Sequence, residues 1–180
     1  RERSEGKPAI LVYAHYGGRE LTGACKSLLA VLIGAKMAGH RLLVVCPAEG
    51  ALSETLREAA IDYCVLPCAR WDVAPLRSIP GIWKRFARWL CSRLSILRTI
   101  QTCFRRHLWV TKGFHPDVIY TNTCVVPMGA LVAMATRVPH VFHVREFIDK
   151  GFGRVPAFGW TLFGATLKRS AAVIVNSHAL

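Results

Sequence analysis

Acidic residues are scarce in this chain of 180 residues, which carries 24 Lys and Arg but only 11 Asp and Glu, for a formal net charge of +13. The imbalance is local, because residues 77–115 contain nine Lys or Arg and no acid. A concentrated positive charge is typical of a surface that meets anionic lipid or nucleic acid. No known nucleic-acid-binding motif accompanies it, so nucleic acid is the less expected partner.

The sequence also lacks long hydrophobic runs and paired cysteine motifs. The longest weakly charged stretch, residues 125–144, is interrupted by prolines, histidines and an arginine, which excludes a membrane-spanning helix there. Seven cysteines are scattered, and Cys64 and Cys68 have no second Cys or His pair at zinc-ligand spacing. No signal peptide is visible. We therefore expect free thiols in a reducing, cytoplasmic compartment, with no metal site and no cofactor.

Hydrophobic runs alternate with helical periodicities along the whole chain. The runs predict strands at 9–14, 41–46, 61–66, 117–121, 139–144 and 171–175, and the periodicities predict helices at 20–38, 53–60, 79–112, 126–136 and 156–169. The segment 79–112 fits either one long helix or a helix pair. Nearly continuous hydrophobic strands separated by helices indicate a mostly parallel sheet covered on both faces. Because no interior linker divides it, we predict one doubly wound α/β domain over residues 1–180.

Polar residues follow three of the predicted strands at the point where each ends. They lie in segments 15–20, 121–123 and 143–146. In doubly wound folds, ligands bind at the carboxyl ends of the parallel strands. The chemistry is therefore predicted at one edge of the sheet.

Five short motifs follow one another along the chain. A glycine pair, Gly17 and Gly18, ends the first strand, and the later motifs read AGHRLLVVCP at 38–47, HPDVIYTN at 115–122, VPHVFHVRE at 138–146 and AAVIVNS at 171–177. Their order and spacing over residues 9–180 resemble family 4 glycosyltransferases. The resemblance implies the Rossmann-like, N-terminal, acceptor-side half of a GT-B fold.

The resemblance implies an activity for the complete enzyme. Family 4 enzymes move a sugar from a nucleotide diphosphate sugar to an acceptor with retention of anomeric configuration, mostly without a metal. Their second domain binds the donor, in part through a Glu-x7-Glu motif that is absent from these residues. We therefore expect the donor-binding C-terminal domain to lie outside this chain, and the 180-residue chain alone to be inactive.

The resemblance also implies roles for individual residues. Gly17, Gly18 and Arg145 would contact the phosphate and sugar of the donor, because glycine lets the backbone approach a phosphate. His143 would lie at the reaction centre as the catalytic residue. The acceptor side would be lined by Tyr16, Arg19, Thr121, Asn122, Thr123 and Glu146.

Each of these assignments has a structural alternative. The glycine pair can serve only the turn from strand to helix, and His143 can be a hydrogen-bonded histidine of the sheet edge. Arg145 can pair with Glu146 instead of a phosphate. The polar residues 121–123 can cap the next helix.

The basic segment 77–115 is also amphipathic when it is read as a helix. One stripe of it holds Trp83, Phe86, Leu90, Leu94, Leu97, Phe104 and Leu108. We expect binding to an anionic membrane surface through Trp83, Lys84, Arg85, Arg88 and Trp89, by a protein that is peripheral at the inner face of the membrane. A membrane surface favours a lipid-linked acceptor, as in polysaccharide assembly. The alternatives are a core-packed helix with a solvated basic face, and a non-catalytic module that binds an acidic surface, either membrane or nucleic acid.

Overall fold

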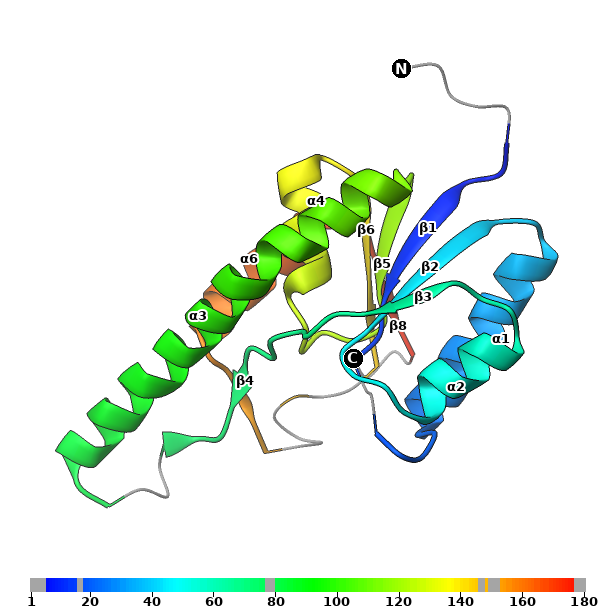
Figure 1. Ribbon diagram of the computed structural model, residues 1–180. Helices are drawn as coiled ribbons and strands as arrows, with labels where there is room; N and C mark the ends of the chain where they lie inside the picture. Colours follow the sequence, from blue (N-terminus) through cyan, green and yellow to red (C-terminus); the bar gives the residue numbers. More distant parts are fainter. Residues whose placement is uncertain (1–5, 16–17, 77–79, 146–147, 149–152, 177–180) are drawn as a thin grey trace.

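A computed structural model describes residues 6–15, 18–76, 80–145, 148 and 153–176. Its centre is a parallel sheet of six strands in the order β3-β2-β1-β5-β6-β8. The strands are β1 Ala9–Tyr13, β2 Arg41–Cys46, β3 Tyr63–Val65, β5 Val118–Thr121, β6 His140–Val144 and β8 Ala172–Val175. The order reverses direction between β1 and β5, where doubly wound folds form a crevice at the carboxyl ends of the strands. The predicted fold class is confirmed (Figure 1).

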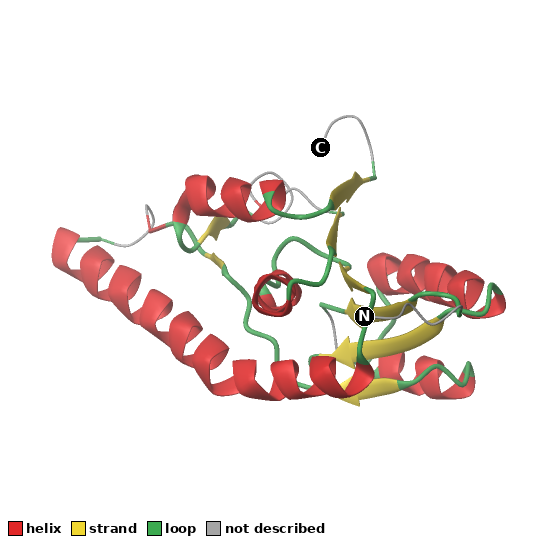
Figure 2. Cartoon of the chain, turned by 90° about the horizontal axis from the view of Figure 1, so that it is seen from above, coloured by secondary structure: helices red, strands yellow, loops and turns green. Residues whose placement is uncertain are grey.

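Helices cover both faces of the sheet. They are α1 Gly23–Met37, α2 Ala51–Glu58, α3 Ile82–Phe114, α4 Met128–Thr136 and α6 Gly159–Lys168. Figure 2 shows the sheet between α1 and α2 on one side and α3, α4 and α6 on the other. The side chains of β1 alternate between the two cores, since Leu11 and Tyr13 face the α3–α4 side and Val12 faces the α1–α2 side. Burial on both faces explains why the strands read as continuous hydrophobic runs.

Helix α4 packs unusually close to the sheet because Gly129 has no side chain. A Cβ atom built on Gly129 would lie 2.1 Å from Oγ1 of Thr121 and 3.0 Å from the ring of Tyr13. Both neighbours are fully buried. The small-residue sequence of α4 is therefore a packing requirement of this contact.

Helix α3 is much longer than the strands that it accompanies. Its 33 residues make it about 50 Å long, whereas the four residues of β5 span about 13 Å. The helix ends at Phe114, shortly before β5 begins at Val118, so its C-terminal end lies at the amino edge of the sheet. Its N-terminal half consequently runs past the sheet on the side of the carboxyl ends (Figure 1).

Only the C-terminal half of α3 is anchored in the core. His107 is fully buried there, with Nδ1 3.3 Å from the hydroxyl of Tyr13 and Nε2 3.1 Å from the carbonyl oxygen of Pro67. Burial lowers the pKa of His107, so the ring is neutral and bridges the helix to the end of β1. The N-terminal half is different, because every residue from 82 to 91 is exposed.

A short antiparallel ribbon, unforeseen in the sequence, lies apart from the six-stranded sheet. It pairs β4 (Asp72–Val73) with β7 (Val155–Pro156). The carboxylate of Asp72 is 1% exposed and accepts hydrogen bonds from Arg70, at 2.9 Å and 3.0 Å, and from Arg154. Burial opposes ionisation of Asp72, but these two guanidiniums outweigh it and lower the pKa of Asp72. The ion pairs thus tie two segments 82 residues apart.

Two further differences from the sequence-based expectations concern element boundaries and exposure. Helix α2 begins at Ala51, two residues before the predicted start, because the hydroxyl of Ser53 accepts a hydrogen bond from the backbone N–H of Gly50 at 2.9 Å. Strand β8 lies at the edge of the sheet with all four residues exposed. Within the ranges described above, none of the helices combines the length and apolar character that a membrane span needs.

Candidate functional site

Four polar side chains meet at the carboxyl edge of β5 and β6. Tyr120 and Asn122 come from the end of β5, and His143 and Arg145 come from the end of β6. Parallel pairing of Thr121 with Phe142 brings these two strand ends together. Three of the four were expected there from the sequence, and Tyr120 was not.

Arg145 forms hydrogen bonds to three neighbouring side chains. Its Nε–H donates to Oδ1 of Asn122 at 2.7 Å, its Nη1–H donates to the hydroxyl of Ser27, and its Nη2–H donates to Nδ1 of His143 at 3.3 Å. All three partners are neutral groups. Among the described residues, no carboxylate forms a salt bridge with Arg145, so its positive charge is not neutralised by them. Ser27 lies in the second turn of α1, and the N-terminus of this helix adds a favourable potential for an anion.

His143 is held as a neutral ring with both nitrogens occupied. Nε2 lies 2.6 Å from Oδ1 of Asn176, which can only accept, so Nε2 carries the proton. Nδ1 then accepts from Arg145 and lies 2.5 Å from the hydroxyl of Tyr120. Burial and the charge of Arg145 together lower the pKa of His143, against an opposing effect of the bond to Asn176. His143 is therefore a neutral ring whose two nitrogens are both engaged in hydrogen bonds within the site.

The end of β1 contributes a second neutral histidine to the same edge. Burial, together with the positive charges of Arg70 and Arg145, lowers the pKa of His15 to about 4. Arg70 reaches this edge from the segment just before β4. Two arginines from distant parts of the chain thus raise the electrostatic potential around His15, which favours an anion at this edge.

The other residues predicted for the site differ in accessibility. Thr121, Asn122 and Thr123 are fully buried, whereas Arg19 is exposed. The hydroxyl of Thr121 lies 2.8 Å from Nε2 of His140, and the hydroxyl of Thr123 accepts from the backbone N–H of Val125 at 3.2 Å. Thr121 and Thr123 thus make structural contacts inside the fold, while Asn122 reaches Arg145.

The glycine loop is described only in part. The carbonyl oxygen of Gly18 accepts a hydrogen bond from the N–H of Ala51 at 3.1 Å, which ties the loop to the first turn of α2. Tyr16, Gly17 and Glu146 lie outside the described residues.

Sequence reasoning missed three contributors to the cluster: Ser27, Tyr120 and Arg70. Ser27 and Arg70 carried no recognisable signal, because each is a single polar residue outside the three strand ends. Tyr120 did carry one. It alternates with the buried Ile119 along β5, so its side chain leaves the opposite face of the sheet together with that of Asn122.

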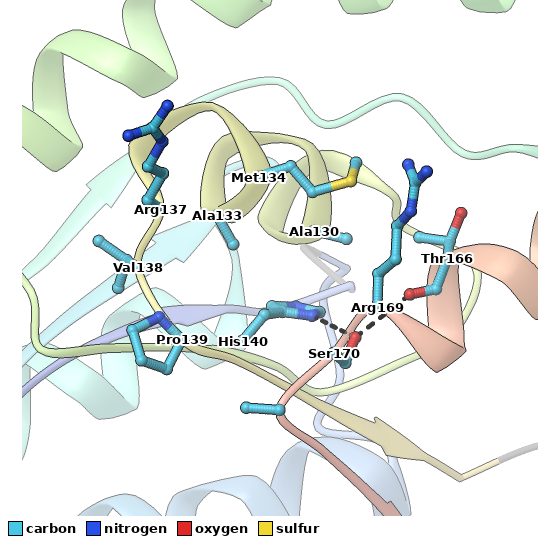
Figure 3. A pocket seen from close by; sticks show the side chains of 11 residues that line it. Ala130, Ala133, Met134, Arg137, Val138, Pro139, His140, Thr166, Arg169 and Ser170 are labelled. Carbon is cyan, nitrogen blue, oxygen red and sulfur yellow. Dashed lines mark hydrogen bonds between the residues drawn. The ribbon is translucent and has the colours of Figure 1, made fainter.

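A separate hollow of about 340 Å³ lies at the opposite, amino edge of the sheet, between α4 and the end of α6 (Figure 3). His140 borders it, and both ring nitrogens are engaged, Nε2 with Thr121 and Nδ1 with the hydroxyl of Ser170 at 2.9 Å. Burial lowers the pKa of His140 to about 4. Because it lies at the amino edge of the sheet, away from the carboxyl ends where doubly wound folds bind ligands, this hollow is not the predicted site.

The residues predicted to bind a membrane all lie on the extended half of α3. Trp83 is 82% exposed and Trp89 is 40% exposed, and Lys84, Arg85 and Arg88 are exposed beside them. The alternative of a core-packed helix therefore applies to only one half of α3. The half near His107 packs in the core, and the half near Trp83 presents a basic and aromatic surface.

No arrangement of three or more His, Cys, Asp or Glu side chains in the described part of the chain is suited to hold a metal ion. The site instead offers a guanidinium that no carboxylate of the described residues neutralises, together with neutral histidines and a helix N-terminus. Groups of these kinds bind phosphate and hydroxyl groups.

Comparison with solved structures identifies glycosyltransferases of the same fold. The Anabaena protein Alr3699/HepE in complex with UDP-glucose matches with a TM-score of 0.60 and 20% identity, over 96% of this chain and 38% of that one. MurG of Acinetobacter baumannii matches with a TM-score of 0.57 and 13% identity, over 94% of this chain and 41% of that one. Spinosyn rhamnosyltransferase SpnG, complexed with spinosyn aglycone, matches with a TM-score of 0.51 and 13% identity, over 81% of this chain and 36% of that one. The chain thus spans about two fifths of the length of these proteins.

No curated protein matches the sequence itself. A family described as "Glycosyl transferase 4-like domain" matches residues 23–180, which is most of the chain. The structural likeness to halves of GT-B glycosyltransferases agrees with this match and with the motifs that end β1, β5 and β6. The chain therefore belongs to the glycosyl transferase 4-like domain family.

Proposed function

We propose that the protein containing this chain transfers a sugar from a nucleotide diphosphate sugar to an acceptor, with this domain as the acceptor-side wall of the cleft. The observation that carries the proposal is the Arg145 cluster at the carboxyl edge of the sheet. It combines a guanidinium bonded to neutral partners with two histidines that burial keeps neutral. The donor would be held mainly by a C-terminal domain outside these residues, so the 180-residue chain alone would be inactive.

The proposed reaction retains the configuration of the anomeric carbon. The bond between that carbon and the phosphate oxygen breaks, and a bond to the acceptor oxygen forms on the same face. The acceptor proton passes to the departing phosphate oxygen, so no protein carboxylate pair and no metal are required. Arg145 stabilises the charge that develops on the departing diphosphate, as preorganised cations do in phosphate-releasing reactions.

His143 has a different role in this proposal. Because its Nε2–H already donates and its pKa is lowered, it acts as a neutral hydrogen-bonding group and not as the base. Gly17 and Gly18 would let the backbone approach the donor phosphate. Tyr16, Arg19 and Glu146 would face the acceptor. Thr121, Asn122 and Thr123 are all fully buried, so Asn122 would act by orienting Arg145 and the two threonines by supporting the strand end.

The acceptor is proposed to be lipid-linked and to be met at the cytoplasmic face of a membrane. The supporting observation is the extended half of α3, which carries exposed tryptophans and basic residues past the carboxyl edge of the sheet. Tryptophan favours the headgroup region, and each basic residue near an anionic surface contributes about 1 kcal/mol. A membrane-bound acceptor would thereby be brought to the same edge as Arg145.

The test is turnover by the full-length protein with a panel of UDP, GDP and dTDP sugars and a membrane lipid extract as acceptor. We expect release of the nucleoside diphosphate only when the extract is present, and an anomeric configuration in the product that equals that of the donor by NMR. A protein that neither binds nor turns over any of these donors, yet binds anionic vesicles, would be a non-catalytic module. Inverted configuration would overturn the mechanism but not the transfer.

A further inference from the structure

An apolar groove lies between the extended half of α3 and the start of α6. Its volume is about 540 Å³, and its lining comprises Trp89, Leu90, Arg93, Leu94, Leu97, Ala157, Phe158 and Gly159. Leu94 and Leu97 are 42% and 49% exposed, although both are large apolar side chains. Trp160 and Leu162 continue the apolar surface on α6, with half of each side chain exposed. Nothing in the proposed cleft uses this groove.

One basic group stands at the wall of the groove. The guanidinium of Arg93 lies 4.4 Å above the ring of Trp89, and its Nη1–H donates to the carbonyl oxygen of Trp89 at 3.0 Å. The contact with the indole holds the charge beside the apolar floor. An occupant with a hydrocarbon chain and an anionic group therefore complements both parts of the groove.

The ribbon of β4 and β7 connects this groove with the Arg145 cluster. Residues 157–159, which line the groove, directly follow β7. Arg70 precedes β4 at this same end of the ribbon, because the strands are antiparallel and the N–H of Ala157 donates to the carbonyl oxygen of Trp71 at 2.6 Å. The charge of Arg70 also contributes to lowering the pKa of His15. Arg70 and Arg154 share the carboxylate of Asp72, which leaves one net positive charge in that triad beside the apolar groove.

We infer that the groove binds the hydrocarbon chain of the acceptor, and that the acceptor carries a phosphate between this chain and the group that receives the sugar. This inference rests on the proposed function and specifies its acceptor. The chain lies on Leu90, Leu94, Leu97 and Phe158, and the phosphate is attracted by Arg93 and the ribbon arginines. Binding of the hydrocarbon chain in the groove thus selects which molecule of the membrane surface reaches His143.

Dodecyl phosphate is a suitable probe, used with the full-length protein below the micelle-forming concentration and without vesicles or nucleotide sugar. Each methylene buried from water favours binding up to about fourfold. Because the groove is open on one side, we expect hexyl phosphate to bind at least tenfold more weakly, a conservative figure for six methylenes. Dodecyltrimethylammonium, with the same chain and the opposite charge, should bind at least tenfold more weakly as well. Equal affinity for all three probes, or no binding of dodecyl phosphate, overturns the inference.

A double variant tests whether dodecyl phosphate binds in the groove. Leu94→Gln with Leu97→Gln should weaken dodecyl phosphate at least tenfold, and because both side chains are already exposed the melting temperature should change little. The matched control is Trp109→Gln, an apolar residue 76% exposed on the same helix but outside the groove, which should change affinity less than twofold. If the control weakens binding equally, the groove is not the site. Should the double variant fail to fold, Arg93→Gln, which keeps the apolar floor, should still lose the preference for phosphate.

Vesicle binding distinguishes the proposed acceptor from other molecules that could occupy the groove. The double variant should retain co-sedimentation with phosphatidylglycerol vesicles, because Trp83, Arg85 and Arg88 lie outside the groove. A parallel loss of vesicle binding would assign the groove to bulk phospholipid. A dimer in solution that the double variant dissociates would assign it to a second copy of the chain. Either result overturns the acceptor assignment, whereas binding of dodecyl phosphate by a protein without transferase activity would refute only the proposed function.

Discussion

The Nε–H of Arg145 donates to Oδ1 of Asn122 across 2.7 Å, and this single bond joins the ends of two neighbouring parallel strands. It fixes the guanidinium next to the ring of His143 and the N-terminal part of α1. A cation positioned in this way needs no reorganisation when charge develops on a leaving group, which is the basis of electrostatic catalysis.

Arg145→Gln should therefore reduce kcat/KM of the full-length protein about 100-fold, with a smaller loss of stability because the half-buried side chain also bonds Asn122. The measurement is steady-state release of the nucleoside diphosphate, with the melting temperature recorded in parallel. Arg169→Gln is the matched control, because Arg169 lies at the opposite edge of the sheet and should leave kcat/KM unchanged. Comparable activity of the two variants would remove Arg145 from the proposed mechanism.

The packing of α4 gives a sharp prediction about stability. Gly129→Ala should destabilise the domain by about 1–3 kcal/mol, because the new methyl group would overlap Oγ1 of Thr121 and press on the ring of Tyr13. Gly164→Ala in α6 is the control, since no atom lies within 4 Å of its added Cβ. That control should be neutral or stabilising by about 0.5–1 kcal/mol, as alanine has the higher helix propensity. Urea unfolding followed by circular dichroism distinguishes the two, and equal effects would mean that α4 can move away from the sheet.

Histidine burial predicts how stability changes with pH. The folded pKa of His140 is about 4, compared with about 6.5 in the unfolded chain, so unfolding takes up a proton between these values. Its contribution to stability is complete above pH 6.5 and is lost as the pH falls toward 4. The loss is about 2 kcal/mol between pH 7 and pH 5 for one such histidine, and His15 adds to it.

His140→Gln should flatten this dependence in urea unfolding at the two pH values. The variant is expected to be less stable at pH 7, because the bonds to Thr121 and Ser170 are disturbed, but to lose less between pH 7 and pH 5. Gly164→Ala, which changes no titratable group, serves as the control and should keep the wild-type slope. An unchanged slope in His140→Gln would show that other groups govern the acid sensitivity.

The sequence was sufficient to predict the parallel sheet and the edge at which its polar strand ends meet. All six strands of the parallel sheet coincide with hydrophobic runs. In the central strands the reason is burial on both faces, which removes the polar alternation, whereas β8 is equally apolar although its four residues are exposed. The polar strand ends at Asn122, His143 and Arg145 were predicted to meet because the carboxyl ends of parallel strands lie at one edge of the sheet. The pairing of β4 with β7 was not predictable, because two-residue strands carry no periodicity and their partners are 82 residues apart.

The hydrogen bonds within the site also could not be predicted from the sequence. Alternation along β5 places Asn122 on the opposite face from Thr121 and Thr123, but it does not show that Asn122 bonds Arg145 or that the two threonines make contacts inside the fold. The amphipathic pattern of α3 likewise runs without a break through an exposed half and a buried half. The difference between the halves follows from length, since a helix of 33 residues cannot be covered along its whole extent by strands of three to six residues.

The final prediction concerns membrane attachment by the extended half of α3. Arg85→Glu with Arg88→Glu should weaken co-sedimentation of the full-length protein with phosphatidylglycerol vesicles at least tenfold. The change removes two positive charges and adds two negative ones, and each basic residue near an anionic surface contributes about 1 kcal/mol. Both residues are exposed, so the fold should be preserved.

The matched control is Arg105→Glu with Arg106→Glu, which reverses the same charges at exposed positions in the anchored half of the helix. Because that half packs around His107 against the sheet, its charges lie far from the surface formed by Trp83 and Trp89, and binding should fall much less. Salt at about 1 M, where the Debye length is about 3 Å, should release the wild-type protein to the level of the first double variant. Equal losses in both double variants would mean that net charge alone drives attachment. Binding unaffected by either variant or by salt would mean that the extended half of α3 does not face a membrane.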